Sequence, residues 1–126
     1  MTQTNEFLDV LKQNNPPSPP DWDATMKILR DFCTGVEQFV SGKLKCRLMP
    51  GYTVNMGREY KPTVETPNGA TFILLRIYIP KDGLPVSLNA YADDLITCTT
   101  HQMLKDELKI FLSQPSLKAM LLGMTP

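Results

Sequence analysis

The sequence predicts an α+β domain: a long N-terminal helix packed on a four- to five-stranded antiparallel meander sheet, closed by one or two C-terminal helices. Two observations carry this prediction. Apolar residues recur at helical spacing in the first third of the chain and again after residue 99, whereas between these segments apolar and polar residues alternate with a period of two. The length of 126 residues is usual for one domain.

Residues 1–15 are expected to hold a short amphipathic helix, Glu6–Gln13. Phe7, Leu8 and Leu11 share one face of this helix. A helix of this length is not stable alone in water, so it must dock on the domain, on a second copy or on another protein.

Residues 16–20 form a proline-rich spacer, because proline fixes φ and removes an amide donor. Their Pro-x-x-Pro spacing is also one that aromatic grooves bind, but a stiff, extended spacer explains the run without a partner. Residues 21–126 are predicted to form a single globular α+β domain.

The most strongly patterned element is a helix from about Trp22 to Ser41. Its wide apolar stripe comprises Trp22, Met26, Ile28, Leu29, Phe32, Cys33, Val36, Phe39 and Val40. Gly42 stands where a helix commonly ends in a left-handed residue. The stripe predicts that this helix is the centre of the core.

Five strands are predicted from the alternation that follows. They lie at residues 43–48, 52–56, 60–66, 70–79 and 84–91, separated by turns at Pro50-Gly51, Gly57-Arg58, Pro67-Asn68-Gly69 and Lys81-Asp82-Gly83. Pro62 predicts an edge position for the third strand, because proline cannot donate to a ladder. The strand over residues 70–79 is apolar on both faces, which predicts a central strand covered on both sides.

The closing segment is predicted to be helical. Thr99 and Gln102 have the spacing of a capping box for a helix Thr100–Leu112. A second helix, Pro115–Leu122, is expected to begin at its proline and to end before Gly123.

Composition limits the classes of function. Lys plus Arg and Asp plus Glu both number 13, so the net charge is zero and a nucleic-acid ligand is not expected. Cys33, Cys46 and Cys98 form no paired metal or redox motif and are interpreted as reduced, buried thiols. With no secretory or membrane-spanning pattern, the expectation is a cytoplasmic protein without cofactor or metal.

Two short strings could suggest catalysis. Tyr91-Ala92-Asp93-Asp94 resembles the Tyr-x-Asp-Asp turn of reverse transcriptases, but the upstream strands lack the further aspartate that magnesium chemistry needs, so we interpret it as an acidic loop. Cys98 and His101 are three residues apart, yet the histidine falls in the first turn of a helix, where the ring is expected to face water. We predict no catalytic residue.

The leading functional hypothesis is a non-catalytic protein-interaction or adaptor module that self-associates, its partner being another protein or a second copy. The predicted partner-binding residues are Phe7, Leu8 and Leu11 of the short helix, with Phe72, Leu74 and Tyr78 of the two-faced strand.

Two alternatives stay open. The first is a small-molecule-binding domain or minor enzyme with a cavity between the helix and a curved sheet. Its candidate pocket residues are Tyr52, Tyr60, Asp94, Cys98 and His101, with Tyr78 as a further polar side chain. The second is weak nucleic-acid binding through a basic strip formed by Lys43, Lys45, Arg47 and Arg76.

Overall fold

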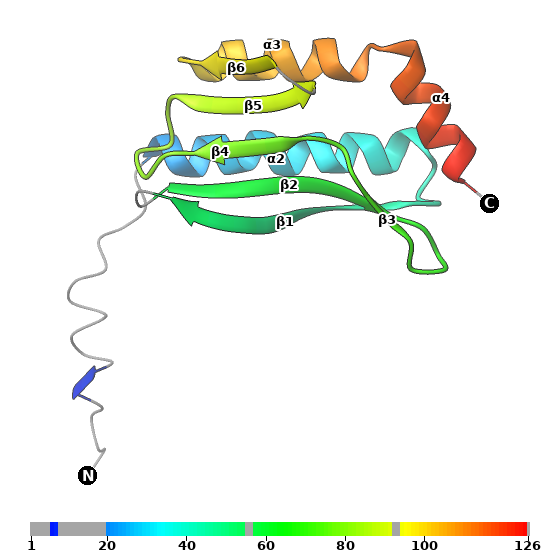
Figure 1. Ribbon diagram of the computed structural model, residues 1–126, viewed down its shortest axis with the longest axis horizontal. Coiled ribbons are helices and arrows are strands. Elements are labelled where there is room, and N and C mark those ends of the chain that lie inside the picture. Colours follow the sequence, from blue (N-terminus) through cyan, green and yellow to red (C-terminus); the bar gives the residue numbers. More distant parts are fainter. Residues whose placement is uncertain (1–5, 8–19, 55–56, 92–93, 126) are drawn as a thin grey trace.

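The computed structural model describes residues 6–7, 20–54, 57–91 and 94–125 (Figure 1). Its elements are α2 (Pro20–Phe39), β1 (Lys45–Val54), β2 (Gly57–Glu65), β3 (Thr71–Ile73), β4 (Arg76–Ile79), β5 (Val86–Tyr91), β6 (Asp94–Cys98), α3 (His101–Leu112) and α4 (Pro115–Met124). The predicted α+β fold, with a long helix on an antiparallel sheet and two closing helices, is confirmed. Glu6 and Phe7 are helical, while the rest of the predicted short helix and the spacer up to residue 19 lie outside the described residues.

The sheet is a meander with strand order β1-β2-β4-β5-β6, and every pair is antiparallel; β3 pairs with β2 beside β4. Figure 1 shows α2 and α3 behind the sheet, and in the described part of the chain no helix covers the face toward the viewer. The two faces alternate along each strand: in β2, Tyr60 and Val64 pack on the core, whereas Lys61 and Thr63 line the open face. The prediction that the central strand is covered on both sides is therefore wrong.

Helix α2 supplies the largest share of the helical side of the core. Asp21 and Asp23 stand in its first turn, where the positive end of the helix dipole favours them. The core side chains that it shares with α3, α4 and the sheet include Leu29, Val36, Leu44, Val64, Ile77, Ile79, Val86, Leu88, Leu104 and Leu121. The helix ends at Phe39, and two left-handed residues follow: Ser41, with φ of 56°, and the predicted Gly42, with φ of 73°, whose amide donates to the Glu37 carbonyl over 2.9 Å.

The sequence predicted a turn at Pro50-Gly51, but strand β1 does not turn there. It continues through both residues to Val54, with an irregular register just beyond Pro50. Because β1 is the first strand of the sheet path, the proline has only β2 to pair with, which an edge strand tolerates. Gly57, expected in a turn, instead begins β2 opposite Val54.

Pro62 lies in an interior strand and not at the edge. Strand β2 pairs with β1 on one side and with β3 and β4 on the other. The Pro62 carbonyl accepts from the Leu74 amide over 2.8 Å, and the amide and carbonyl of one strand residue face the same neighbour. The missing N–H of Pro62 thus falls where Leu74 and Leu75 leave the ladder. This gap divides the predicted continuous strand 70–79 into β3 and β4.

The segment predicted as a loop after Tyr91 contains a further strand, β6. It pairs with β5, and Leu95 lies opposite Asn89. The closing helices also differ slightly from the prediction. Thr100, and not Thr99, caps α3 by accepting from the Met103 amide over 3.1 Å, and α4 runs through Gly123 to Met124.

A polar network, here called the α2 latch, joins Asp21, Thr25, Gly83 and His101. The fully buried Thr25 Oγ1 donates to the Gly83 carbonyl over 2.9 Å, and His101 Nε2 lies 3.0 Å from Thr25 Oγ1 and 3.2 Å from the Asp21 carbonyl. Because the one hydroxyl proton points to Gly83, Thr25 Oγ1 accepts from Nε2, which therefore carries a proton. The His101 ring, predicted to face water, is half-buried and ties α3 to α2.

We expect Gly83→Ala to lower the free energy of unfolding by about 2–4 kcal/mol. Gly83 has φ of +91°, and a Cβ atom there would lie 2.4 Å from the Asp21 carbonyl carbon, so the β4–β5 turn would have to leave α2. Gly69→Ala is the control: φ is +90° but nothing lies within 4 Å, so only the backbone strain of about 1–2 kcal/mol remains. Urea denaturation measures both, and equal losses would contradict the close packing.

We expect Thr25→Val, which keeps the side-chain shape, to lower the free energy of unfolding by about 1–3 kcal/mol. The substitution removes the donor to the Gly83 carbonyl and the acceptor for His101 Nε2 in a buried site. The control Thr97→Val, on an exposed position of β6, should stay within about 0.5 kcal/mol of the parent chain. A Thr25→Val protein as stable as the control would show that the latch contributes nothing.

Candidate functional site

A groove runs along the seam between α2 and the two C-terminal helices. It consists of two hollows of about 250 and 190 Å³ that share Leu112. We call it the helical groove; its lining is Ile28, Asp31, Phe32, Gly35, Val36 and Phe39 of α2, Lys105, Leu108, Lys109 and Leu112 of α3, and Lys118 and Leu121 of α4.

The floor of the helical groove is apolar, and its rim is basic. Phe32 packs against Phe111 of α3 with ring centroids 6.3 Å apart, which holds the two helices together under the groove. Phe39 is 45% exposed at the far end. Three lysines of α3 and α4 line the groove together with one aspartate of α2, Asp31, which is ion-paired with Lys27 of its own helix over 3.5 Å. The lining therefore combines an apolar floor with three cations and one carboxylate.

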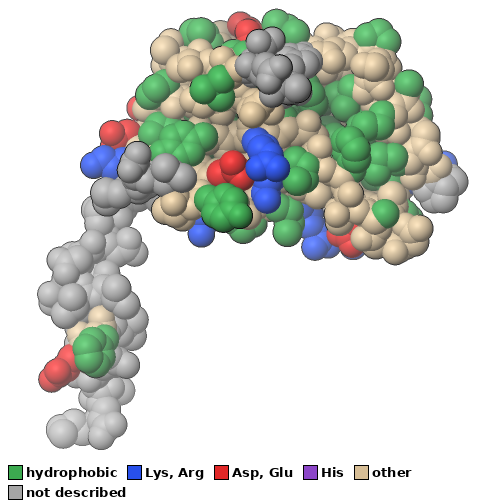
Figure 2. Space-filling view, in the orientation of Figure 1, with side chains coloured by type: hydrophobic (Ala, Val, Ile, Leu, Met, Phe, Trp, Pro, Cys, Tyr) green, Lys and Arg blue, Asp and Glu red, His purple; other side chains and the backbone are tan. Residues whose placement is uncertain are grey.

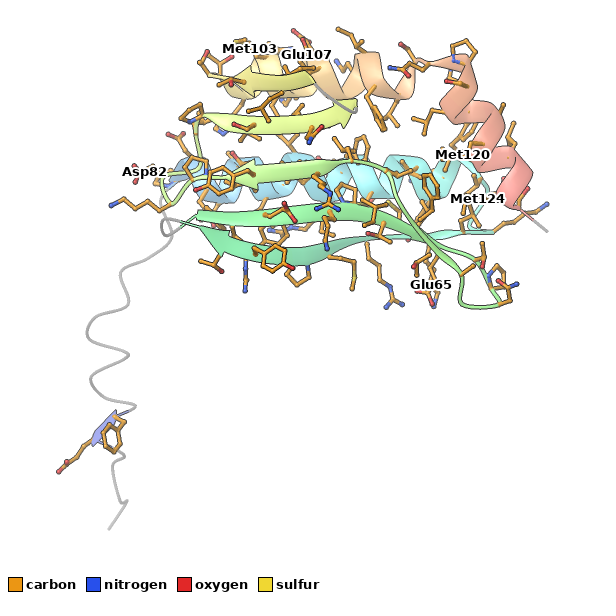
Figure 3. The ribbon with its side chains drawn as sticks, viewed as in Figure 1. Glu65, Asp82, Met103, Glu107, Met120 and Met124 are labelled. Atoms are coloured by element: carbon orange, nitrogen blue, oxygen red, sulfur yellow. The ribbon has the colours of Figure 1, made fainter. Side chains whose placement is uncertain are left out.

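The bend between α3 and α4 sets the end of the groove. Ser113 ends α3 by donating its amide to the Lys109 carbonyl over 2.9 Å, and Pro115 starts α4 in the first turn, where a missing amide donor is tolerated. Figure 3 shows Met120 and Met124 projecting from α4 toward the core, against which both are packed. Leu121 is thereby placed beside α2.

A second hollow, the thiol hollow, opens on the other flank of α2, toward β1 and β2. Its volume is about 460 Å³, and its lining is Met26, Arg30, Cys33, Thr34, Glu37, Cys46, Leu48 and Tyr60. Glu37 Oε1 accepts from the Cys46 amide over 2.7 Å, which joins α2 to the start of β1. Cys33 of α2 and Cys46 of β1 line this hollow together, and their thiols shift each other's pKa.

The interaction between the two thiols shifts the pKa values of Cys33 and Cys46 in opposite directions. The interaction with Cys46 lowers the pKa of Cys33, although burial and the Glu37 carboxylate act against it. The same interaction raises the pKa of Cys46, and burial raises it further. Cys33 is therefore the more acidic thiol of the two.

The open face of the sheet mixes charges with apolar side chains (Figure 2). A shallow hollow of about 260 Å³ lies over β1, β2 and β3, lined by Arg47, Met49, Lys61, Thr63, Glu65, Thr71 and Ile73. The exposed Leu95 lies on β6, at the opposite edge of the sheet. Apolar groups on this face are thus scattered among charges.

The structure separates the predicted partner-binding residues. Phe7 is 82% exposed, whereas Leu8 and Leu11 lie outside the described residues. Phe72 is 46% exposed in β3 and Leu74 is buried at the gap between β3 and β4. Because that gap reverses the alternation, Phe72 and the half-buried Tyr78 do not share one apolar face.

The pocket candidates are also dispersed. Tyr60 lines the thiol hollow, whereas Tyr52 is 77% exposed on β1. Cys98 is fully buried, and burial, with a smaller effect of the Glu107 carboxylate on α3 (Figure 3), raises its pKa. His101 belongs to the α2 latch. The Asp94 side chain is not among those described.

The predicted basic strip is partly neutralised. Lys45 and Arg47 are exposed on β1, but Lys45 is opposite Glu65 in the ladder. Arg76 lies on β4, with its Nη1 atom 3.9 Å from Glu59 Oε1. Lys43 is exposed before β1. The four cations do not form an uninterrupted positive surface.

The helical groove was not predicted from the sequence. The signal for it was the excess width of the α2 stripe, in which Ile28, Phe32 and Phe39 lie beyond the residues that one sheet can cover. The thiol hollow could not be predicted either, because the sequence spacing of Cys33 and Cys46 does not reveal that α2 and β1 bring them to one place.

No protein-family model, curated protein or solved structure matches this chain. Within the described residues, no three His, Cys, Asp or Glu side chains gather as a metal site would require. None of the helices in the described ranges is long and apolar enough to cross a membrane. The helical groove and the thiol hollow, on either side of α2, are therefore the features from which a function can be argued.

Proposed function

We propose that this protein is a non-catalytic interaction module that self-associates, with residues 6–13 of one copy seated in the helical groove of a second copy. The observation that carries the proposal is the groove itself: an apolar seam between helices, rimmed by three lysines. Amphipathic helices bind such grooves through anchors spaced along one face.

The N-terminal segment has the chemistry that this groove requires. Its predicted helix presents Phe7, Leu8 and Leu11 on one face. Residues 6–13 carry a net charge of −1 (Glu6 and Asp9 against Lys12), which is opposite in sign to the basic rim formed by Lys105, Lys109 and Lys118. A short helix of this kind gains its stability from docking.

The length of the linking chain permits the exchange. Residues 14–19, six in all, span up to about 20 Å when extended, and the groove begins at Ile28, about 12 Å along α2 from Pro20. Phe7 is 82% exposed, so its ring does not lie in the groove of its own chain. Reciprocal exchange between two copies gives a closed, symmetric dimer with both grooves filled.

We further propose a reducing, cytoplasmic setting, supported by three cysteines that are all free thiols in the structure.

A small-molecule site is the second candidate function. The thiol hollow supports it, because about 460 Å³ lies within the usual range of ligand pockets and Arg30, Glu37 and Tyr60 supply polar groups. Nucleic-acid binding has little support, since carboxylates interrupt the basic strip.

We expect the triple variant Phe7→Ala, Leu8→Ala, Leu11→Ala to weaken self-association by at least about a hundredfold, because buried anchors dominate such interfaces. Light scattering after size exclusion, at several concentrations, measures the mass. The matched control Met49→Ala, Ile73→Ala, Leu95→Ala removes three exposed apolar side chains from the open sheet face. A monomeric parent chain, or a dimer lost only in the control, would overturn the proposal.

We expect the charge reversal Lys105→Glu, Lys109→Glu to weaken the dimer roughly fivefold to tenfold, since rim charges contribute modestly. Adding Glu6→Lys and Asp9→Lys should restore the affinity by reversing the partner charges. Lys81→Glu, exposed in the β4–β5 turn and outside the groove, is the control. Analytical ultracentrifugation gives the dissociation constants, and a failure of the compensating pair to restore them would exclude this pairing.

A further inference from the structure

The thiol hollow brings together two cysteines from different elements. Cys33 comes from α2 and Cys46 from β1; both are buried, and both line the same hollow of about 460 Å³. Because the described cysteines are all free, the pair stands in its reduced state. A hollow beside the pair gives a reagent room to approach.

We propose that Cys33 and Cys46 form a thiol–disulfide exchange site that reacts with low-molecular-weight disulfides of the oxidised-glutathione class. The Cys33 thiolate attacks one sulfur of the external disulfide, which forms a mixed disulfide on Cys33 and releases one glutathione thiolate. Cys46 then gives up its proton and attacks the Cys33 sulfur, which releases the second glutathione. In sum, two protein thiols are oxidised to one intramolecular disulfide, and one glutathione disulfide is reduced to two glutathione thiols.

The geometry assigns different roles to the two sulfurs. Both thiols line one hollow, where the interaction with Cys46 lowers the pKa of Cys33 and raises that of Cys46, so Cys33 is the attacking thiol. Cys46 is the resolving thiol, because it lines the same hollow as the Cys33 sulfur that it must attack. Glu37 positions Cys46 by accepting its backbone amide over 2.7 Å.

The surroundings fit a charged tripeptide disulfide. Arg30 supplies a cation to the lining, opposite in sign to the carboxylates of glutathione, and Met26 and Leu48 supply apolar walls. Cys98 provides an internal comparison, because all three cysteines are buried but Cys98 lies outside this hollow, and burial raises its pKa. The inference does not depend on self-association, since the thiol hollow and the helical groove lie on opposite flanks of α2.

The test is exposure of the reduced, full-length native protein to oxidised glutathione, followed by alkylation, intact mass measurement and peptide mapping. We expect a Cys33–Cys46 disulfide that forms at least roughly tenfold faster than any adduct on Cys98. The same product should form in the Cys98→Ser variant. Equal rates at all three cysteines, or reaction only after urea is added, would overturn the proposal.

Two variants test the roles. Cys46→Ser should accumulate a lasting glutathione adduct on Cys33, because no thiol remains to release it. Cys33→Ser should leave Cys46 unmodified over the same period. Circular dichroism checks that both variants are folded, and the wild-type peptide map decides the proposal even if one is not. A Cys33→Ser protein that acquires glutathione on Cys46 as fast as the wild type forms its disulfide would contradict the assignment.

Discussion

Helix α2 packs against two surfaces at once, and the rest of the structure depends on this double contact. Five strands side by side span about 19 Å, whereas a helix is only about 10 Å wide, so α2 cannot cover the inner face of the sheet alone. Helix α3 completes the cover beside β6, and Phe32 of α2 meets Phe111 of α3 at the seam. Two round helices on one sheet leave a furrow between them. The helical groove is therefore a geometric consequence of how the sheet is covered.

The sequence revealed the elements whose signals are local. The wide stripe of α2, the left-handed Gly42 and the alternation along the strands each involve residues near one another in the chain. The sequence-based predictions were wrong where the structure depends on which strand pairs with which in the sheet. Pro62 predicts an edge, yet it lies in an interior strand because its missing amide coincides with the gap between β3 and β4. Pro50 predicts a turn, but an outer strand with one neighbour accommodates it.

The candidate sites were less predictable than the fold, because each joins residues that are distant in sequence. The surplus apolar width of α2 indicated that a second surface existed, but only the placement of α3 and α4 shows a basic rim above it. Cys33 and Cys46 were predicted to be buried thiols, and both are. Their mutual contact depends on how β1 returns beside α2 after Gly42, which no spacing rule gives. His101 is a similar case, since its bonding partner Thr25 lies 76 residues away.

The helical groove and the thiol hollow are both lined by α2, so the position of this helix determines the shape of each. Residues 26, 30, 33, 34 and 37 of α2 face β1, and residues 28, 31, 32, 35, 36 and 39 face the C-terminal helices. A helix moves as a rigid rod, so a shift that narrows one hollow widens the other. The α2 latch resists this shift at one end, where Thr25 and the Asp21 carbonyl hold His101 and the β4–β5 turn. Farther along the helix, the bond from the Cys46 amide to Glu37 fixes α2 against β1. A helix held at both places keeps the groove and the thiol pair formed before any ligand arrives, which lowers the cost of binding at either one.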